Sequence, residues 1–419
     1  MTRIIIAFCF FILCANAFAT RILIPMDDEQ RNHLKAYGIA YWVLAKDLEV
    51  NWLLNYRGGS FMMSYTDVFE KECRIRGVSY EVVSEGQVTS ILLQIAKADV
   101  NMELVKLLKA PKIAVYSPKT KQPWDDAVTL VLSYAEIPYE IVFDDEVLDG
   151  KLSKYDWLHL HHEDFTGQYG KFYSTFANAA WYQAEVRENE SMAAKHGFHK
   201  VSELKLAVAK KIRDYVVGGG FMFAMCSATD TYDIALAADG IDIVEVPFDG
   251  DPADWSADKK LDFSKCFAFK DYRLYFDPMT YEHSFIDAMQ GTRPVTEEND
   301  VFSLFEFSAK WDMVPAMLNQ NHTSTVKGFW GQTTAFRKLF IKSDVIILGD
   351  NKSLNEARYI HGTFGKGTWT FYGGHDPEDY QHQVGEPPTD LALHPNSPGY
   401  RLILNNVLFP SAQKKKLKT

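Results

Sequence analysis

The segment around Cys226 has the residue order of a strand that turns sharply into a helix. The apolar stretch Phe221–Met225 precedes the cysteine, and a helical pattern over 231–238 follows it. Ala224 and Ala228, two positions away on either side, leave room for the strained backbone that holds a nucleophile at such a turn. A thiol beside a helix N-terminus is a candidate nucleophile. The alternative is a small residue that simply fits a tight turn.

A second candidate is His375, which follows a strand-like stretch in the run Gly-Gly-His-Asp-Pro-Glu-Asp. A nucleophilic cysteine needs a base, and the base needs a carboxylate that orients it. His375 is therefore the predicted base, with Glu378 or Asp376 as the orienting group. Each of these residues also suits an ordinary polar turn.

A third group lies at the end of another apolar stretch, Tyr155–His161, and directly after it. Its members are His159, His161, His162, Glu163 and Asp164. In a strand His159 and His161 share one face, and the polar residues after them fall at its end. Imidazoles and carboxylates in this number can bind zinc or another divalent cation. The spacing matches no metal motif, so contacts to substrate or to the loop at the cysteine are equally expected. We expect no cofactor, with a divalent metal on His159, His161 and His162 as the alternative. The expected substrate or oxyanion contacts are Ser227, His161, His162, Glu163 and Asp164.

The elements that position these groups are predicted strands and helices that alternate along the chain. Such alternation is typical of parallel βαβ units, and it predicts an α/β fold with a doubly wound, mostly parallel, flavodoxin-like sheet. An additional βαβ unit is predicted near the N-terminus. The stretches that carry this prediction are 21–25, 33–46, 49–54, 112–116, 124–135 and 139–143. Further strands are expected at 79–83, 155–161, 221–225 and 344–348, helices at 88–108 and 204–217, and a hairpin at 357–364 and 368–372.

The expected organisation has five parts. Residues 1–19 are a signal peptide, 20–110 an N-terminal α/β unit, and 111–240 with 331–410 the α/β core. Residues 241–330 are a lid-like insertion, because they are rich in Asp, Phe and Tyr and poor in periodic segments. The basic tail is 411–419.

The chain opens with Arg3, an apolar run from Ile4 to Leu13, and Ala-Phe-Ala at 17–19. This is the order of a cleavable secretory signal. The run has about half of the ~20 apolar residues that cross a bilayer. We therefore expect an exported protein, periplasmic or extracellular, without membrane insertion after cleavage.

The amino-acid composition limits the classes of molecule that the protein is expected to bind. Lys and Arg number 44 against 55 Asp and Glu, for a net charge of −11, so nucleic acid is not an expected partner. Three of the five cysteines, Cys73, Cys226 and Cys266, remain after cleavage, and an odd number leaves at least one thiol without an intramolecular partner. The expected partner is a small-molecule substrate, and the oligomeric state is not predicted.

Two runs resemble a known family. Residues 212–226, IRDYVVGGGFMFAMC, resemble the approach to the nucleophile in the class I glutamine amidotransferase-like superfamily, and 365–380, GKGTWTFYGGHDPEDY, resemble its trehalose-utilisation-protein-like branch. The resemblance implies a doubly wound core over 112–240 and 340–410. It also implies Cys226 as nucleophile with His375 and Glu378 as partners. The whole chain resembles exported proteins commonly labelled asparagine synthetase B, although the Ser-Gly-Gly-X-Asp-Ser loop of such synthetases is absent.

These observations predict an exported amidotransferase-like hydrolase or amidase that acts through Cys226 and His375 on a small amide-bearing or sugar-derived substrate. A thiol pKa below the free value of ~8.5 is expected. A non-catalytic ligand- or glycan-binding protein is the alternative, since aromatic residues crowd the insertion. They are Trp255, Phe263, Phe267, Phe269, Tyr272, Tyr275 and Tyr281. A second alternative is a metal-dependent hydrolase that uses the run His159–Asp164.

Overall fold

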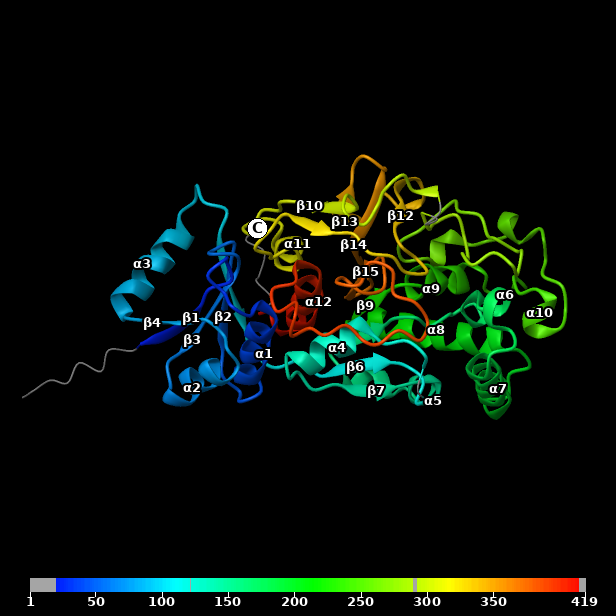
Figure 1. Cartoon of the computed structure of the whole chain (residues 1–419), viewed down its shortest axis with the longest axis horizontal. Helices are drawn as coiled ribbons and strands as arrows, with labels where there is room; N and C mark the ends of the chain where they lie inside the picture. The colour runs from blue at the N-terminus through cyan, green and yellow to red at the C-terminus, as the bar shows by residue number, and fades with distance from the viewer. Residues whose placement is uncertain (1–19, 121, 289–291, 414–419) are drawn as a thin grey trace, which may run out of the picture.

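The computed structural model describes residues 20–120, 122–288 and 292–413. The expected signal peptide and most of the basic tail lie outside the described residues. Two sheets organise the chain, and Figure 1 shows the smaller one at the N-terminal end of an elongated molecule. No helix in these three ranges is long and apolar enough to cross a membrane.

The N-terminal sheet is antiparallel, with strand order β4-β1-β3-β2-β5. The predicted βαβ unit is therefore wrong: β3 lies between β1 and β2 and pairs antiparallel with both. The cause is the turn 55–59, where Asn55, Arg57, Gly58 and Gly59 have positive φ and return the chain as a hairpin. The elements are β1 (Arg21–Ile24), α1 (His33–Leu44), β2 (Val50–Leu54), β3 (Ser60–Ser64), α2 (Asp67–Ile75), β4 (Glu81–Val83), α3 (Glu85–Ala96) and β5 (Glu103–Leu107).

The large sheet is mixed, with strand order β11-β10-β13-β14-β15-β9-β8-β6-β7, and β12 pairs with β14. Only the half from β15 to β7 is parallel; β14, β13, β10 and β11 pair antiparallel. The expected doubly wound, mostly parallel, flavodoxin-like fold is therefore wrong. The strands are β6 (Ile113–Tyr116), β7 (Glu140–Val142), β8 (Trp157–Leu160), β9 (Phe221–Met225), β10 (Val301–Leu304), β11 (Thr325–Lys327), β12 (Phe336–Arg337), β13 (Ile346–Asn351), β14 (Glu356–Phe364) and β15 (Gly367–Tyr372).

Two features of the chain produce this mixture. The tight turn after β14 makes β14 and β15 a hairpin, so β14 must run against the parallel strands. The segment 241–330, expected as a covering insertion, supplies β10 and β11 to the sheet itself. The helices of this part are α4 (Ala127–Tyr134), α5 (Asp144–Leu148), α6 (Tyr173–Phe176), α7 (Ala180–Lys195), α8 (Val201–Gly218), α9 (Ala228–Ala237), α10 (Val246–Asp249), α11 (Met313–Leu318) and α12 (Pro398–Leu408).

Helices cover both faces of the parallel strands, and β9 shows how its residues divide between them. Met222 and Ala224 enter the core beneath α8 and α9, whereas Phe223 and Met225 enter the core beneath α4 and α12. Successive strand residues point to opposite faces, so an apolar run without alternation is what a strand buried on both faces requires. Because β9 is buried on both faces, its last residue, Met225, is held in the core, and Cys226 follows directly after it.

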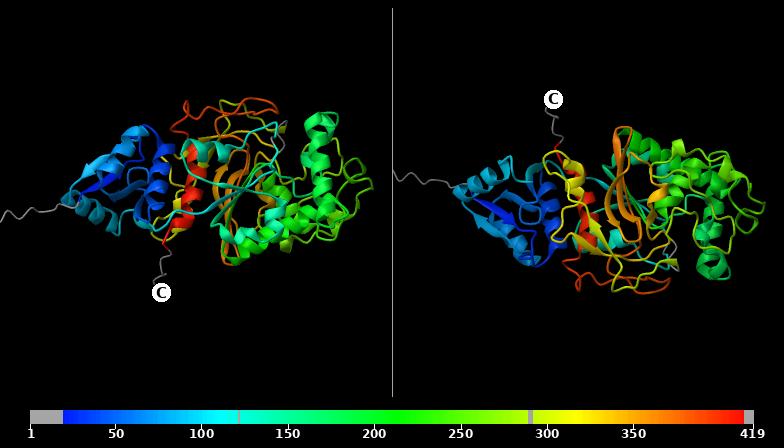
Figure 2. Two further views of the ribbon diagram at one scale, coloured as in Figure 1. Left: turned by 90° about the horizontal axis from the view of Figure 1, so that it is seen from below. Right: turned by 90° about the horizontal axis from the view of Figure 1, so that it is seen from above.

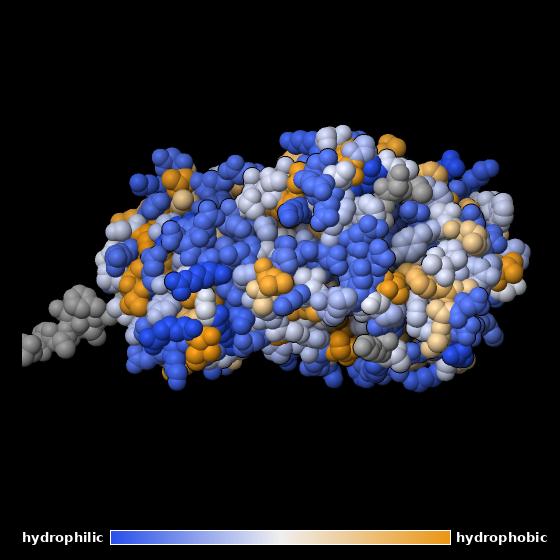
Figure 3. Space-filling model, viewed as in Figure 1, coloured by the Kyte–Doolittle hydropathy of each residue, from blue (hydrophilic) through white to orange (hydrophobic). Residues whose placement is uncertain are grey.

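The N-terminal sheet and the large sheet share one core. Helix α12 lies between them in Figure 2, and its side chains pack with those of α1 and α4. On the face seen in Figure 3, hydrophobic side chains are scattered in small groups among hydrophilic ones. That face therefore shows no broad apolar surface of the kind that marks a large interface.

Candidate thiol and histidine site

The chain turns from β9 into α9 at Cys226, whose φ of 53° lies in the left-handed region. A non-glycine residue there is strained, and such strain is concentrated at functional sites. Ala224 and Ala228 are fully buried beside the turn. The strained residue therefore presents its thiol at the carboxyl end of a parallel strand.

The thiol of Cys226 is buried, and its Sγ accepts a hydrogen bond from the N–H of Gln332 at 3.2 Å. Burial raises the pKa of the thiol to about 11, although the N–H groups of Gln332, Ser227 and Thr333 act in the opposite direction. The expected lowering of this pKa is therefore wrong, because desolvation outweighs the helix N-terminus. All three described cysteines are free.

The loop after β8 is tied to the start of α9. Ser227 Oγ donates to the carbonyl of His162 at 2.8 Å, and the N–H of Ala228 donates to that of His161 at 2.9 Å. Thr231 Oγ1 donates to the carbonyl of Glu163 at 3.1 Å. The hydroxyl of Ser227 thus holds the loop.

The two acidic residues of that loop lie apart from the thiol. Asp164 accepts hydrogen bonds from the N–H groups of Thr166, Gln168 and Gly170, so it shapes the following turn. Burial raises the pKa of Glu163 to about 8, and Lys205 moderates the rise. Glu163 lines a second cavity, of about 50 Å³, whose lining shares Trp124 and His162 with the cavity that contains Cys226.

The ring of His375 lines the same cavity as Cys226. It lies against three other imidazoles, with ring centroids 4.5 Å from His162, 4.8 Å from His382 and 5.0 Å from His161. Its Nε2 is 4.0 Å from Oδ1 of Asp125. The structure thus brings the predicted base and nucleophile to one cavity.

The predicted orienting carboxylates are directed elsewhere. Glu378 pairs with Nδ1 of His394 at 3.1 Å, and Asp376 accepts the N–H of Glu378 at 2.9 Å. Within the described ranges, no hydrogen bond or ion pair joins either of them to the His375 ring. Asp125 is the carboxylate that faces this ring.

Asp125 also faces His382, whose Nε2 lies 2.8 Å from Oδ1, and His382 Nδ1 lies 2.9 Å from Asp379. The two carboxylates, Asp125 first, raise the pKa of His382 to about 9. Burial would raise the pKa of Asp125, but His375 and His382 hold it well below its usual range. A cationic imidazole between two anionic carboxylates is the resulting arrangement.

The fold does not bring the three histidines of the expected metal site, His159, His161 and His162, to one point. Asp126 pairs with His159 at 3.0 Å and with His161 at 3.2 Å, while its other oxygen caps α4. The rings of His161 and His162 stack at 3.6 Å. Among the described residues, no group of donor atoms within 4.8 Å contains His159, His161 and His162 together.

The cavity of about 150 Å³ has aromatic and polar walls. None of the described residues lining it is Lys, Arg, Asp or Glu. Among the described residues of the lining, the histidines are the side chains that can carry a positive charge. The lining residues are Trp124, His162, Phe172, Cys226, Ser227, Tyr281, Trp330, Gly331, Gln332, His375, Gln381, His382, Gln383 and Val384.

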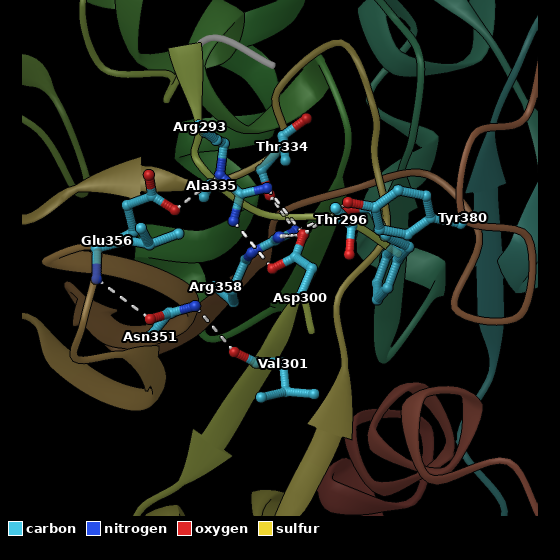
Figure 4. A network of polar contacts seen from close by, with 12 residues as sticks. Arg293, Thr296, Asp300, Val301, Thr334, Ala335, Asn351, Glu356, Arg358 and Tyr380 are labelled. Atoms are coloured by element: carbon cyan, nitrogen blue, oxygen red, sulfur yellow. Dashed lines mark hydrogen bonds and ion pairs between the residues drawn. The ribbon is translucent and has the colours of Figure 1, made fainter. Parts of the chain in front are cut away.

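A buried ionic network supports the loop that carries Gln332 (Figure 4). Asp300 pairs with Arg293 at 2.8 Å and with Arg358 at 2.7 Å. Arg358 donates to the carbonyls of Phe329 and Thr334 at 2.7 and 2.9 Å. The ends of the loop are thus fixed, and its N–H groups face the thiol.

The aromatic residues of the segment 241–330 are divided between the core and the surface. Phe267, Phe269 and Tyr272 are buried, whereas Trp255 is 75% and Tyr281 37% exposed. Phe263 and Tyr275 are half-buried. Of the seven only Tyr281 lines the cavity, so they do not form one exposed stacking surface.

Sequence reasoning missed Asp125, Asp126, Gln332 and His382. The Asp125-Asp126 pair precedes a helix, and Asp126 is a typical N-cap, so this signal was available. His382 and Gln332 lie in segments without periodicity. Nothing in the sequence indicated which strands they would face.

No known protein family matches the sequence, and no curated protein matches it. Several solved structures are similar, among them the following three. Two cytoplasmic proteins from Salmonella typhimurium, the second from strain LT2, each share 11% identity over 72% of this chain and all of their own, with TM-scores of 0.35 and 0.33. The GH42 beta-galactosidase Gan42B shares 11% over 64% of this chain and 28% of its own, with a TM-score of 0.28.

Proposed function

We propose that the cavity is the active site of a hydrolase or amidase in which Cys226 is the nucleophile and His375 the base. One observation carries the proposal: a thiol held at positive φ between a strand and a helix shares a cavity of about 150 Å³ with a histidine that faces a carboxylate. Nucleophile, base and orienting carboxylate are the parts that covalent hydrolysis requires. Asp125 takes the third role.

The high pKa of the thiol determines the order of events. With a pKa of about 11, Cys226 is neutral at rest, so His375 accepts its proton while Sγ attacks the carbonyl carbon of the substrate. His375 then gives this proton to the leaving amine or alcohol as its bond to carbon breaks. A thioester remains on Cys226. Water deprotonated by His375 hydrolyses it, which releases the acid and restores the thiol.

Backbone N–H groups supply charge stabilisation in this scheme. Those of Ser227, Gln332 and Thr333 act on the sulfur of Cys226. Fixed donors that act on the sulfur stabilise the negative charge that develops there as His375 takes the proton. The ion pairs of Asp300 support this role, because they fix the ends of the loop that carries Gln332 and Thr333.

The walls of the cavity support a small, uncharged, polar substrate. The described lining holds no lysine or arginine, and the charge of His382 is already paired with Asp125 and Asp379, so the lining favours a substrate without a carboxylate or phosphate. Trp124, Phe172 and Trp330 offer apolar faces, and Gln381 and Gln383 offer amides. Amide-bearing and sugar-derived compounds combine these features. The signal-like residues 1–19 support an exported enzyme.

The test is a hydrolysis screen with neutral amides, esters and acylated sugars. We expect Cys226→Ala to lower kcat/KM by at least about 10³-fold, as loss of a nucleophile does in comparable sites. Cys73→Ala is the matched control, because Cys73 is buried in α2 and lines no part of the cavity. Mass spectrometry of a quenched reaction should show an acyl group on Cys226. Full activity of Cys226→Ala would refute the proposal.

A second candidate is a non-catalytic binding protein for sugars or related ligands. The aromatic walls formed by Trp124, Phe172, Tyr281 and Trp330 favour it. Calorimetric titration with neutral sugars separates the two functions. Binding that Cys226→Ala leaves intact, in a protein that turns over nothing in the screen, would favour this candidate.

A further inference from the structure

Three donor atoms meet behind the cavity wall. Oδ1 of Asp125 lies 2.8 Å from Nε2 of His382 and 4.0 Å from Nε2 of His375, and the three atoms lie within 4.8 Å of one another. The two rings are nearly parallel, with an interplanar angle of 16°. Both Nε2 atoms therefore face the same carboxylate oxygen.

These donors are buried and contact one another without forming hydrogen bonds of proper geometry. The side chains are 8% (His375), 9% (Asp125) and 2% (His382) exposed. Neither oxygen of Asp125 nor either Nε2 has a hydrogen bond of proper geometry, although the contact to His382 is close. Buried polar atoms normally have partners, so several orphans converging on one point indicate a ligand that binds there.

The donor set suits zinc. Two imidazole nitrogens and a carboxylate oxygen are typical ligands of a Zn²⁺ site with an open fourth position. Tetrahedral bonds of ~2.0–2.1 Å place ligand atoms about 3.4 Å apart. The separations of 2.8 and 4.0 Å lie on either side of that value.

A second carboxylate, that of Asp379, contacts the other ring nitrogen of His382. Asp379 Oδ2 lies 2.9 Å from Nδ1 of His382. A carboxylate there holds the proton on Nδ1 and leaves the Nε2 lone pair for a metal, as in carboxylate–histidine–zinc arrangements.

Two of the other donor groups that contain histidine are less suitable. Asp126 already pairs with His159 and His161 and caps α4. The rings of His161 and His162 stack with centroids 3.6 Å apart, and the donor group that they form with His375 contains no carboxylate. Asp125, His375 and His382 combine two imidazoles with a carboxylate that does not cap α4.

We propose that Asp125, His375 and His382 form a binding site for a zinc-class divalent cation, and that the cation inhibits the thiol chemistry. The inhibitory part rests on the proposed function. An imidazole that binds a metal through Nε2 carries its proton on Nδ1 and has no lone pair left for the thiol proton. Cation binding and hydrolysis therefore exclude each other at His375.

The test is calorimetric titration of the EDTA-treated, dialysed full chain with ZnCl₂, with MgCl₂ as the comparison cation and elemental analysis for stoichiometry. We expect one Zn²⁺ per chain and no Mg²⁺. Asp125→Asn and His382→Gln should each weaken Zn²⁺ binding at least 100-fold, and Asp379→Asn by about 10- to 100-fold. His394→Gln, whose side chain is 35% exposed, is the matched control. Circular dichroism verifies that each variant is folded.

The outcomes separate the two proposals. Absence of stoichiometric Zn²⁺ binding, or equal affinity in wild type and both folded ligand variants, would overturn the metal site. Loss of binding in Cys226→Ala would assign the cation to the sulfur and also overturn it. Stoichiometric binding without hydrolysis of any screened compound would leave the metal site intact and count against the proposed function alone. Hydrolysis that one equivalent of Zn²⁺ does not slow would refute the inhibitory role.

Discussion

The buried thiol of Cys226 should react slowly with iodoacetamide at neutral pH, and its rate can be calculated. With a pKa of about 11, about 10⁻⁴ of the thiol is ionised at pH 7, against about 3% for a free thiol of pKa ~8.5. The ionised fraction is thus about 300-fold smaller. Greater basicity makes the thiolate more reactive by about 10- to 18-fold. Labelling should therefore be about 17- to 30-fold slower than that of a free thiol.

The pH dependence is the sharper measurement. The labelling rate should rise nearly tenfold per pH unit from pH 7 to about pH 10, because the thiolate fraction does. Peptide mass spectrometry after quenching follows each cysteine separately. Burial raises the pKa of Cys73 to about 12 and also raises that of Cys266, and neither lines the cavity, so Cys226 should be labelled first. A plateau below pH 8 in the folded protein would refute the reasoning that desolvation controls this thiol.

Three further predictions concern Asp300, Gly331 and His33. Asp300→Asn removes the charge that faces two buried arginines and should lower the free energy of unfolding by about 3–5 kcal/mol in guanidinium titrations. The exposed Asp271→Asn, the control, should change it by less than about 0.5 kcal/mol. Gly331→Ala would place a Cβ 2.8 Å from the backbone nitrogen of His375, so kcat/KM for any substrate found should fall while circular dichroism stays unchanged. Burial lowers the pKa of His33 from 6.5 to about 3. The unfolded chain thus binds the proton first, and stability that is complete above pH 6.5 falls by about 2 kcal/mol at pH 5. His33→Gln should show a smaller difference between pH 7 and pH 5, and an equal difference in both proteins would contradict the prediction.

The sequence predicted the local geometry of the nucleophile well. An apolar strand without alternation, a small residue on each side and a helical pattern beyond Cys226 all describe local backbone requirements, and the strand and helix lie there. The hairpin of β14 and β15 was predicted for the same reason, since the glycines of its turn are a local signal.

Pairing between distant segments was not predictable in the same way. Alternating strands and helices fit both a βαβ unit and the antiparallel N-terminal sheet, because the choice depends on where each strand finds its neighbour. The predicted helix 88–108 ends as α3 at Ala96, and Glu103–Leu107 pairs with β2 instead. The carboxylate that faces His375 was not predictable for the same reason, because it comes from a distant segment. Glu378 is near in sequence, but Asp125 is the carboxylate that faces the ring.

The position of β15 has a consequence for how the chain acquires its site. This strand lies between β9 and β14, so the strand that ends at Met225 pairs with β8 on one side but lacks its second neighbour until residues 367–372 arrive. Helix α12, which joins the two sheets, comes later still. Contacts between such distant segments slow folding, because a long loop must close before they form. During synthesis the thiol therefore stays outside its cavity until almost the whole chain has been made.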